Sequence, residues 1–518
     1  MKTKLIKSLA VLIVPTFLVL SLNTQHEVDY SKAEVVIEKA DLARLQTMAF
    51  GKDASTTMTF TWNTTNYTNT VVKVVEEGES FDDENVLTFT GNIELSKASG
   101  EDGYIHRVIA TGLTPDTKYN YYIDDLSTNE QIGSFKTSST GNKNFSFMHI
   151  SDPQGTTEAD YLSYNRLLET STSNFSYDFI ALTGDIVNNS WKDHSPALDQ
   201  WEWALTDQYS ILKDYPLMTV SGNHEAALYD FSSRFTYETS DEVRQSGVYY
   251  SFVYEGVYFL ALNTNEGLAE EPGSSLSEAQ LNFVRQDLEA HKSMKWKVVL
   301  MHKGLFDAGS HSSNIAEGED YDIEYYRHDL APLFTEYGVD LVLQGHDHLY
   351  SKSYPIESKD VDGVVTHSAK TDVLVENSDG VKYAYKPNAP IYLNTGSASG
   401  SKYYGVNQSE EMSRLIDFAF NPMCKLFTNI EVDQENNRLT FKTYKQENDT
   451  YELYQAYGIN KGEMFDNGSG SSDPTTPGAP SDTQIDLPLI ITLSVVGGVV
   501  LVAGIIASIV IIRKRRNK

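Results

Sequence analysis

Five short apolar segments of this chain are each followed at once by an aspartate, an asparagine or a histidine. The polar residues concerned are Asp152, Asp185, Asn223, His302 and, after the last segment, His346 and His348. Apolar runs of this length are typical of buried strands. Because ligands of open α/β sheets bind just beyond the carboxyl ends of the strands, these side chains are predicted to gather at one edge of a sheet.

The last of these segments, residues 339–350, raises the question of a metal site. In an extended chain, side chains two positions apart point to the same side, so His346 and His348 can reach one common point. Glycine precedes Asp185, Asn223 and His346, which permits a close approach of the backbone. One such motif is usually a turn or a structural histidine, but five in one domain favour a ligand-binding site.

Two patterns of secondary structure divide the body of the chain. From residue 35 to 138 short strands follow one another directly, which predicts an all-β sandwich. Within it, the stretch 113–119 resembles fibronectin type III domains. From residue 144 to 461 apolar strands alternate with helical stretches, which predicts a layered α/β domain. One of these helices should begin with a capping box formed by Ser277 and Gln280.

Both ends of the chain have the character of membrane-related segments. In residues 1–25 lysines precede an apolar stretch, which predicts a secretory signal peptide. Residues 487–512 carry no charge and form a predicted transmembrane helix, and the basic residues of 513–518 should remain in the cytoplasm. Residues 466–486 form a flexible linker. We therefore predict a single-pass protein of the cell membrane whose folded body is extracellular.

The charge balance excludes one class of partner. The chain has 72 Asp and Glu residues against 41 Lys and Arg residues, a formal net charge of −31. Nucleic acid polymers should therefore be repelled at long range. Cys424 is the only cysteine, so no intrachain disulfide can form. Nothing in the sequence indicates the oligomeric state.

The order of the strand-end motifs resembles the calcineurin-like metallophosphoesterase family. Within it, the nearest resemblance is to purple acid phosphatases, which also carry a fibronectin-like domain in front. The motifs are Asp152, "GD" at 184–185, "GNHE" at 222–225, His302 and "GHDH" at 345–348. The resemblance implies a layered ββ core flanked by helices, two metal ions and a small phosphorylated substrate.

Carried over residue by residue, the resemblance implies that Asp185 bridges the two metal ions. The other implied ligands are Asp152 and His348 for the first ion, and Asn223, His302 and His346 for the second. Oxygen and imidazole ligands without a thiolate suit Zn, Mn or Fe, as divalent or mixed-valence ions. Two such ions can hold the phosphoryl oxygens and an attacking hydroxide. His224 resembles the family's acid, which protonates the leaving group.

Two positions depart from the family pattern, both at the first metal. Where many members have Asp-x-His, this chain has Gln154, and where purple members have a tyrosine three residues after the bridging aspartate, it has Asn188. The first site is therefore expected to be weaker or to use Gln154, Asn188 or water as filler. Because this chain lacks the tyrosinate ligand at position 188, the iron chemistry that colours purple members is not expected here. His311 and Arg327 are further candidates for contacts with the substrate phosphate.

Three functions remain open from the sequence. The leading one is a surface-anchored phosphoesterase with a binuclear metal centre, which hydrolyses phosphomonoesters by attack of a metal-bound hydroxide. A phosphodiesterase or a nucleotide-specific hydrolase would use the same centre. The third is a surface binding protein with a decayed metal site. The presence of every second-site ligand and of His224 favours an enzyme.

Overall fold

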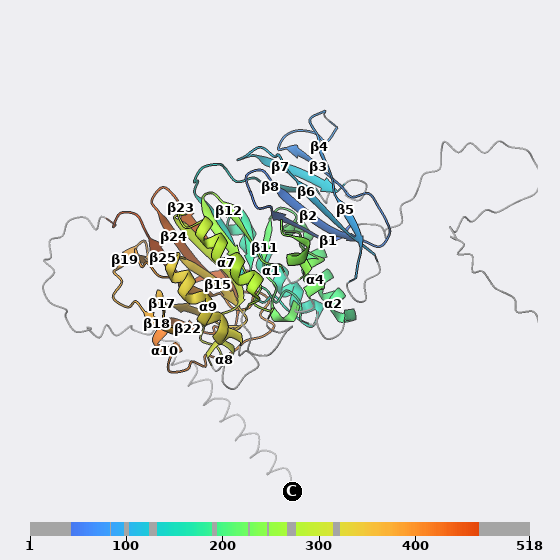
Figure 1. Cartoon of the computed structure of the whole chain (residues 1–518). Helices are drawn as coiled ribbons and strands as arrows, with labels where there is room; N and C mark the ends of the chain where they lie inside the picture. The colour runs from blue at the N-terminus through green and yellow to red at the C-terminus, as the bar shows by residue number, and fades with distance from the viewer. Residues whose placement is uncertain are drawn as a thin grey trace, which may run out of the picture. The chain divides into compact units, whose positions relative to one another are not determined.

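The computed structural model describes most of the chain between residues 43 and 465 (Figure 1). The described ranges are 43–82, 84–97, 103–123, 132–188, 194–225, 228–245, 248–266, 276–313 and 322–465. The predicted signal peptide (1–25), linker (466–486), transmembrane helix (487–512) and basic tail (513–518) all lie outside these ranges. Within the ranges, no helix has both the length and the apolar character needed to cross a bilayer.

The described chain begins with two four-stranded antiparallel sheets. The first has the order β1 (Arg44–Phe50), β2 (Met58–Thr64), β6 (Tyr104–Ala110), β5 (Asn92–Leu95), and the second β4 (Leu87–Thr90), β3 (Val71–Glu76), β7 (Lys118–Ile123), β8 (Gly133–Lys136). Alternate residues of β7 are buried. The ring centroids of Phe60 and Tyr121, one from each sheet, are 4.7 Å apart. The predicted all-β sandwich is therefore confirmed.

Arg107 of β6 joins the sandwich to the second domain. Its guanidinium group donates to the backbone oxygens of Ser232 (2.7 Å) and Phe235 (3.2 Å). It also donates to the hydroxyl of Thr236 at 2.9 Å. These acceptors lie in or just after α4 (Leu228–Ser232). A largely buried cation that is satisfied by several acceptors across the boundary fixes the contact between the two domains.

Two larger sheets follow in the described structure. One has the order β11 (Leu217–Thr219), β10 (Phe179–Leu182), β9 (Phe145–Ile150), β23 (Lys425–Asp433), β24 (Arg438–Glu447), β25 (Thr450–Asn460), β20 (Val381–Tyr385), β19 (Val375–Ser378). The other has the order β12 (Tyr250–Tyr254), β13 (Val257–Ala261), β14 (Trp296–Lys303), β15 (Leu341–Gly345), β21 (Ile391–Asn394), β16 (Tyr350–Ser353), β22 (Ile416–Phe420). A separate hairpin pairs β17 (Ile356–Val361) with β18 (Val364–Ala369).

The two larger sheets pack face to face, which explains why their central strands are apolar almost throughout. In β13, Phe259 faces the other sheet, and its ring centroid lies 5.5 Å from that of Phe147. The next residue back, Tyr258, belongs instead to the apolar cluster that includes residues of α7 (Glu278–Ala290) and α9 (Asp322–Glu336). Since successive side chains of a strand point to opposite faces, a strand buried on both faces needs an unbroken apolar run.

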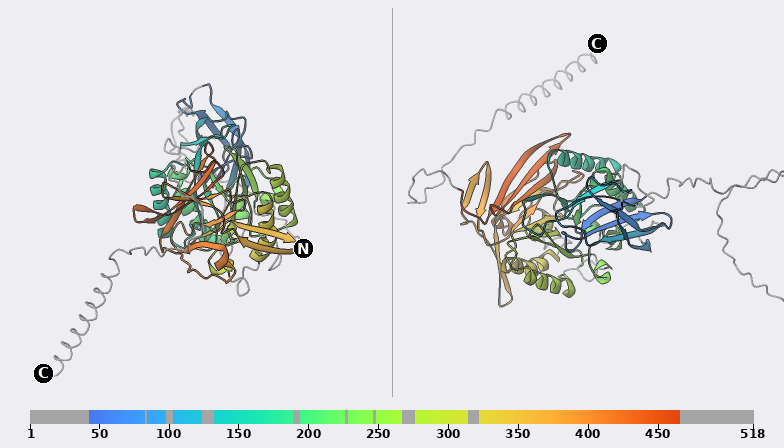
Figure 2. Two further views of the ribbon diagram at one scale, coloured as in Figure 1. Left: turned by 90° about the vertical axis from the view of Figure 1, so that its left-hand side faces the viewer. Right: turned by 90° about the horizontal axis from the view of Figure 1, so that it is seen from above.

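Helices lie on both outer sides of the sheet pair, so the predicted layered α/β domain is confirmed. The left view of Figure 2 shows the teal α1 (Glu158–Asn174) on one side of the strands and the yellow-green α7 and α9 on the other. The shorter helices are α2 (His194–Trp201), η4 (Glu202–Thr206), α3 (Tyr209–Leu212), η5 (Asn223–Glu225), α5 (Asp241–Gln245), α8 (Ser310–Ser313) and α10 (Met412–Leu415).

Helix α7 begins where the sequence predicts, but only half of the capping box is present. The hydroxyl of Ser277 accepts a hydrogen bond from the backbone N–H of Gln280 at 3.2 Å. The predicted reciprocal bond, from the backbone N–H of Ser277 to the side chain of Gln280, is wrong. The buried side chain of Gln280 instead accepts from the N–H of Asn263 and donates to its carbonyl oxygen. The N–H of Ser277 donates to Glu266 at 2.7 Å. The two donors that the capping box would satisfy are thus still satisfied.

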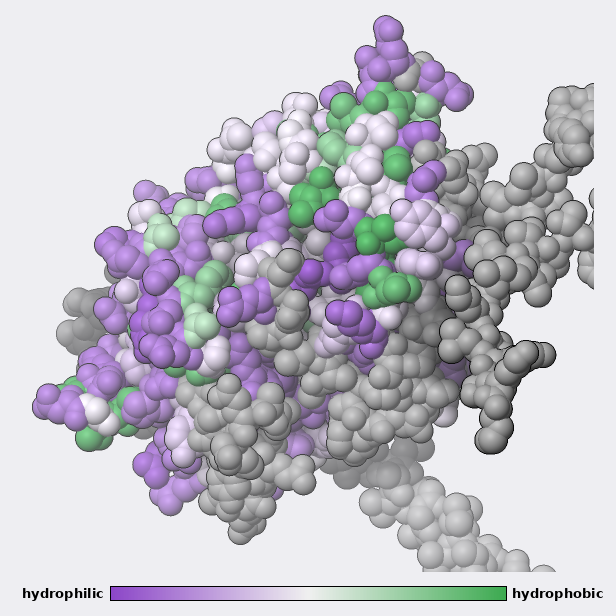
Figure 3. Space-filling model, turned by 45° about the vertical axis from the view of Figure 1, so that its right-hand side comes forward, coloured by the Kyte–Doolittle hydropathy of each residue, from purple (hydrophilic) through white to green (hydrophobic). Residues whose placement is uncertain are grey.

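The surface seen in Figure 3 is mixed in character. Apolar side chains form small groups among hydrophilic ones on this face. Among the exposed large apolar residues are Leu87, Leu95 and Ile109 of the sandwich. Scattered apolar residues of this kind are ordinary on a protein surface.

Candidate metal centre

The polar strand-end residues of both larger sheets meet at one place. β9, β10 and β11 run parallel in one sheet, and β14 and β15 run parallel in the other. Asp152, Asp185 and His346 follow three of these strands, and each has a positive φ, of 50°, 51° and 72° respectively. Non-glycine residues seldom adopt this conformation, and it often marks functional sites. The backbone therefore turns sharply wherever it delivers one of these side chains.

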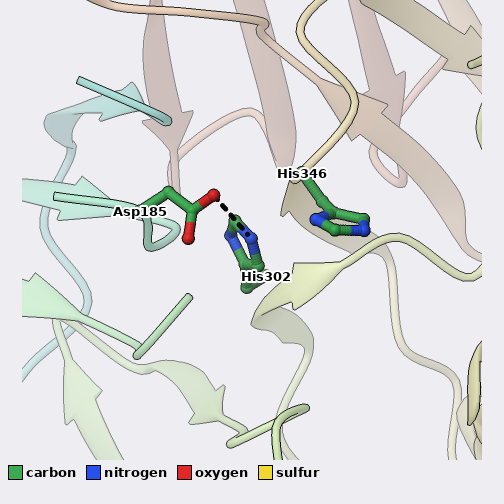
Figure 4. A group of neighbouring side chains, drawn as sticks. All are labelled: Asp185, His302 and His346. Atoms are coloured by element: carbon green, nitrogen blue, oxygen red, sulfur yellow. Dashed lines mark ion pairs between the residues drawn. The ribbon is translucent and has the colours of Figure 1, made fainter. Parts of the chain in front are cut away.

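Two groups of candidate ligands share Asp185. The first group consists of Asp152, Asp185 and His348, and the second group of Asp185, His302 and His346. In each group the ligand atoms lie within 4.8 Å of one another, and all the residues are buried. Figure 4 shows the second group, with the Oδ2 of Asp185 3.3 Å from the Nε2 of His302. One carboxylate common to two triads is the arrangement expected of a bridged pair of cations.

The donor set fits divalent cations. It consists of carboxylate oxygens and imidazole nitrogens, which suit borderline ions such as Zn, Mn or Fe. Burial by itself would raise the pKa of Asp185, but His302 and His224 hold the pKa of this carboxyl well below its ordinary value. Burial by itself would lower the pKa of His302, yet Asp185 and Asp152 raise it to about 9. Buried, ionised carboxylates are stable only beside positive charge, and cations bound at the two groups would supply it.

A hydrogen bond to the backbone orients the ring of His302. Its Nδ1 lies 2.7 Å from the carbonyl oxygen of Thr183, and a carbonyl can only accept, so Nδ1 carries a proton. Its Nε2 then faces the Oδ1 of Asn223 at 3.0 Å and the carboxylate of Asp185. This is the usual arrangement of a metal-ligating histidine, whose second nitrogen is fixed by the backbone. Asn223, which the family resemblance implies as a ligand, thus lies beside the second group.

Glu225 is a residue of this centre that the sequence analysis missed. It is fully buried, and its carboxylate accepts backbone N–H bonds from Asp185 (2.9 Å), Val187 (2.9 Å) and Gly222 (2.7 Å). It thereby ties the loop after β10 to the loop after β11. Gly222 is required there, because a Cβ would lie 2.1 Å from the Oδ1 of Asp185. The signal in the sequence was the acid that closes the "GNHE" motif.

His224 lies at the edge of the centre. Its side chain is 21% exposed, whereas that of Asp185 is 2% exposed. The Nδ1 of His224 lies 2.6 Å from the carbonyl oxygen of Asn188 and so donates to it. Its Nε2 is left 4.0 Å from the Oδ2 of Asp185. The imidazole therefore presents Nε2 beside the carboxylate that the two groups share.

The two departures from the family pattern contact a lysine that the sequence analysis did not identify. The Nζ of Lys402 lies 3.0 Å from the Oε1 of Gln154 and 2.7 Å from the Oδ1 of Asn188. The Nε2 of Gln154 lies 2.9 Å from the Oδ2 of Asp185. Lys402 stands in a loop after β21 without a recognisable motif, so only the fold brings it to the first group.

The remaining candidates differ in their placement. The ring of His311 lies beside the second group, with its centroid 4.4 Å from that of His346. Arg327 donates instead to the backbone oxygens of Leu305 (2.7 Å) and Ser312 (2.9 Å). Among the described residues, Arg327 thus supports α8, the short helix that carries His311. Asp347 is buried and accepts from the N–H groups of His311 and Ser312, at 3.4 and 3.3 Å.

Comparisons with known proteins point to one group of enzymes. Residues 145–350 match the family model of the calcineurin-like phosphoesterases, and residues 46–138 match the N-terminal domain of purple acid phosphatases. Acid phosphatase type 7 of Danio rerio is 26% identical over 368 residues, which cover 66% of this chain and 75% of that protein.

Two further similar proteins extend the comparison. An uncharacterized protein of Mycobacterium tuberculosis is 26% identical over 382 residues, which cover 68% of this chain and 69% of that protein. Among solved structures, a purple acid phosphatase from yellow lupin (Lupinus luteus) seeds has a TM-score of 0.61 at 16% identity, covering 82% of this chain and 75% of that one. The likeness to the lupin structure supports the fold described above.

Proposed function

Because the chain belongs to the calcineurin-like metallophosphoesterases and carries the N-terminal domain of purple acid phosphatases, we propose that it hydrolyses phosphomonoesters at a centre for two metal ions. Its similarity to acid phosphatases identifies it as a metal-dependent phosphoric ester hydrolase. The observation that carries the proposal is the pair of buried ligand groups that share Asp185.

The residues of the two groups would hold the metal ions. Asp152 and His348 form one group with Asp185, and His302 and His346 form the other, with Asn223 beside His302. Bound ions would supply Lewis-acid charge to the phosphoryl oxygens and activate water. Glu225 accepts a hydrogen bond from the backbone N–H of Asp185. This bond fixes the position of the shared carboxylate.

His224 is proposed to protonate the leaving group. The hydrogen bond from Nδ1 to the carbonyl of Asn188 fixes the ring and leaves Nε2 as the nitrogen that takes up and delivers a proton. Its position 4.0 Å from the shared carboxylate supports this role, because it puts Nε2 next to both ligand groups. An imidazole can act as such an acid near neutral pH.

We propose that the phosphoesterase body is held at the outer face of the cell membrane. The support comes from the sequence alone. Residues 487–512 carry no charge, and a run of basic residues follows them. Such a run favours the cytoplasmic side, which would leave the preceding body outside the cell.

A substrate panel measured together with metal content tests the proposal. The protein is stripped with a chelator, reloaded with Zn, Mn or Fe, and assayed on matched phosphomonoesters and phosphodiesters. The expected result is phosphate release from monoesters that disappears on stripping and returns with metal. Faster turnover of diesters or nucleotides would show that these, and not monoesters, are the substrate class. Full metal content without turnover of any ester would indicate a binding protein instead of an enzyme.

A further inference from the structure

Lys402 brings an ammonium group to one of the two ligand groups. Its Nζ lies between two amide oxygens, at 3.0 Å from that of Gln154 and 2.7 Å from that of Asn188. The backbone oxygen of Lys402 lies 3.3 Å from the Nδ1 of His348. His348 and Gln154 both stand at the first group, so this one lysine contacts it through side chain and backbone.

The ammonium group fixes the orientation of the Gln154 amide. Because an ammonium group only donates, it must face Oε1, which turns the NH₂ end of Gln154 inward. This end lies 2.9 Å from the carboxylate of Asp185 and 3.1 Å from the Nε2 of His348. Both neighbours can accept a hydrogen bond, so the network agrees with that orientation. An amide nitrogen has no available lone pair, so Gln154 offers the first group a donor in place of a ligand.

Asn188 is held in the same way. Its Oδ1 bonds the ammonium group of Lys402, and its backbone oxygen accepts from His224. Two oxygens of the kind that bind hard cations are thus engaged by a positive charge next to the first group. At the second group, by contrast, Asn223 directs its Oδ1 towards the Nε2 of His302, at 3.0 Å.

We propose that Lys402 makes the first group the weaker of the two cation sites, by turning the oxygens of Gln154 and Asn188 away and by adding a positive charge beside it. The inference rests on the proposed function in so far as both groups bind cations. It makes Lys402 a positioning residue that sets the order of loading: the second group fills first, and the ion at the first group exchanges.

The test is a calorimetric titration of the metal-stripped full chain with Zn²⁺. The wild-type protein should bind in two phases of different affinity, and Asp152→Asn should remove the weaker phase. Lys402→Met should tighten the weaker phase at least about tenfold, since removing a like charge a few ångströms away relieves repulsion at a partly buried site. The stronger phase should stay unchanged. Lys402→Arg, which keeps the positive charge, should retain the wild-type difference.

A matched control removes the same charge elsewhere. Lys442 on β24 contacts Glu431 at 3.1 Å, and Glu431 pairs with Ser146, near the end of β9 opposite to Asp152. Lys442→Met should leave both phases unchanged. A purely structural role for Lys402 predicts weaker binding in Lys402→Met, and either that result or two equal phases in the wild type would overturn the inference. A wild type that binds none of Zn²⁺, Mn²⁺ and Fe²⁺ would instead refute the proposed function and the inference with it.

Discussion

His224 and His302 illustrate how backbone oxygens decide the chemistry of single residues. Each has its Nδ1 bonded to a carbonyl, that of Asn188 or of Thr183. The remaining nitrogen of His302 is buried against Asp185, where it can bind a cation, whereas His224 is partly exposed and stands farther from the carboxylate. This difference distinguishes a candidate ligand in β14 from a candidate proton donor in η5, although both follow apolar strand segments in the sequence.

Replacement of His224 should affect esters with poor leaving groups most. An activated aryl phosphate expels a stable phenolate, whereas an alkyl phosphate expels a strongly basic alkoxide that needs the proton. His224→Ala should therefore lose roughly a hundredfold to ten-thousandfold in rate on alkyl esters, and much less on activated aryl esters. The measurement is rate against leaving-group pKa for both forms, with metal content determined in parallel. Parallel slopes would remove His224 from the acid role, and a loss of metal would make it a structural residue.

The residues of the centre differ in how far the sequence could predict them. Asp152, Asp185 and His302 are found from the sequence because a strand end places its side chain locally. Lys402 could not be found in this way, because it lies in a loop far along the chain and only tertiary packing brings its Nζ to Gln154. Glu225 was visible as a motif residue, but its partners are backbone N–H groups, which a sequence does not show.

Strand alternation accounts for the elements that carry the centre. Leu341 and Leu343 of β15 belong to the cluster between the sheets, and Val342 to the outer cluster. The apolar run that predicts this strand therefore reflects burial on both faces. The capping box failed at Gln280, since a buried amide bonds the backbone of Asn263 better than it could reach back to Ser277. Periodicity predicts elements, whereas individual polar partners depend on the packing.

The sandwich should lose stability as the pH falls. His106 is buried between the hydroxyls of Thr64 and Thr70, at 2.8 Å each, and its ring stacks on Trp62. Burial lowers the pKa of His106 from 6.5 to about 4. The unfolded chain therefore binds the proton more readily than the folded one. The contribution of the neutral His106 to stability is complete above pH 6.5 and declines towards pH 4, by about 3 kcal/mol.

The corresponding measurement is the melting temperature of the wild type and His106→Gln between pH 7 and pH 4. The variant should be less stable at pH 7 but should lose less on acidification. His328→Gln, which replaces an exposed histidine, serves as the control. An identical acid dependence in the wild type and His106→Gln would show that His106 does not titrate in this way.

On the scale of the whole molecule, the described structure ends with contacts that favour one point of truncation. The N–H of Phe465 donates to Glu376 at 3.1 Å, its ring lies 5.1 Å from that of Tyr383, and the guanidinium of Arg438 lies 4.0 Å above it. The described residues up to Phe465 also belong to one compact unit. The contacts of Phe465 complete the end of this unit, so a shortened protein should retain it.

A protein that ends at Phe465 should be soluble and should keep the phosphatase activity, while the full chain should be found in the membrane fraction. The reason is that the uncharged stretch 487–512 would be absent from the shorter form. Fractionation and phosphate release from both forms provide the measurement. A short form that precipitates or is inactive, beside an active full chain, would contradict the proposed anchor.

Metal content and turnover of two aspartate variants test the central claim most directly. Asp185 belongs to both ligand groups, whereas the carboxylate of Asp347 accepts backbone N–H bonds from α8. Asp185→Asn should abolish turnover and lower the bound metal at both sites, because it removes the charge that the two cations would share. Asp347→Asn should keep both metals and most of the activity. Equal losses in the two variants, or an Asp185→Asn protein with full metal content and turnover, would contradict the shared-carboxylate centre.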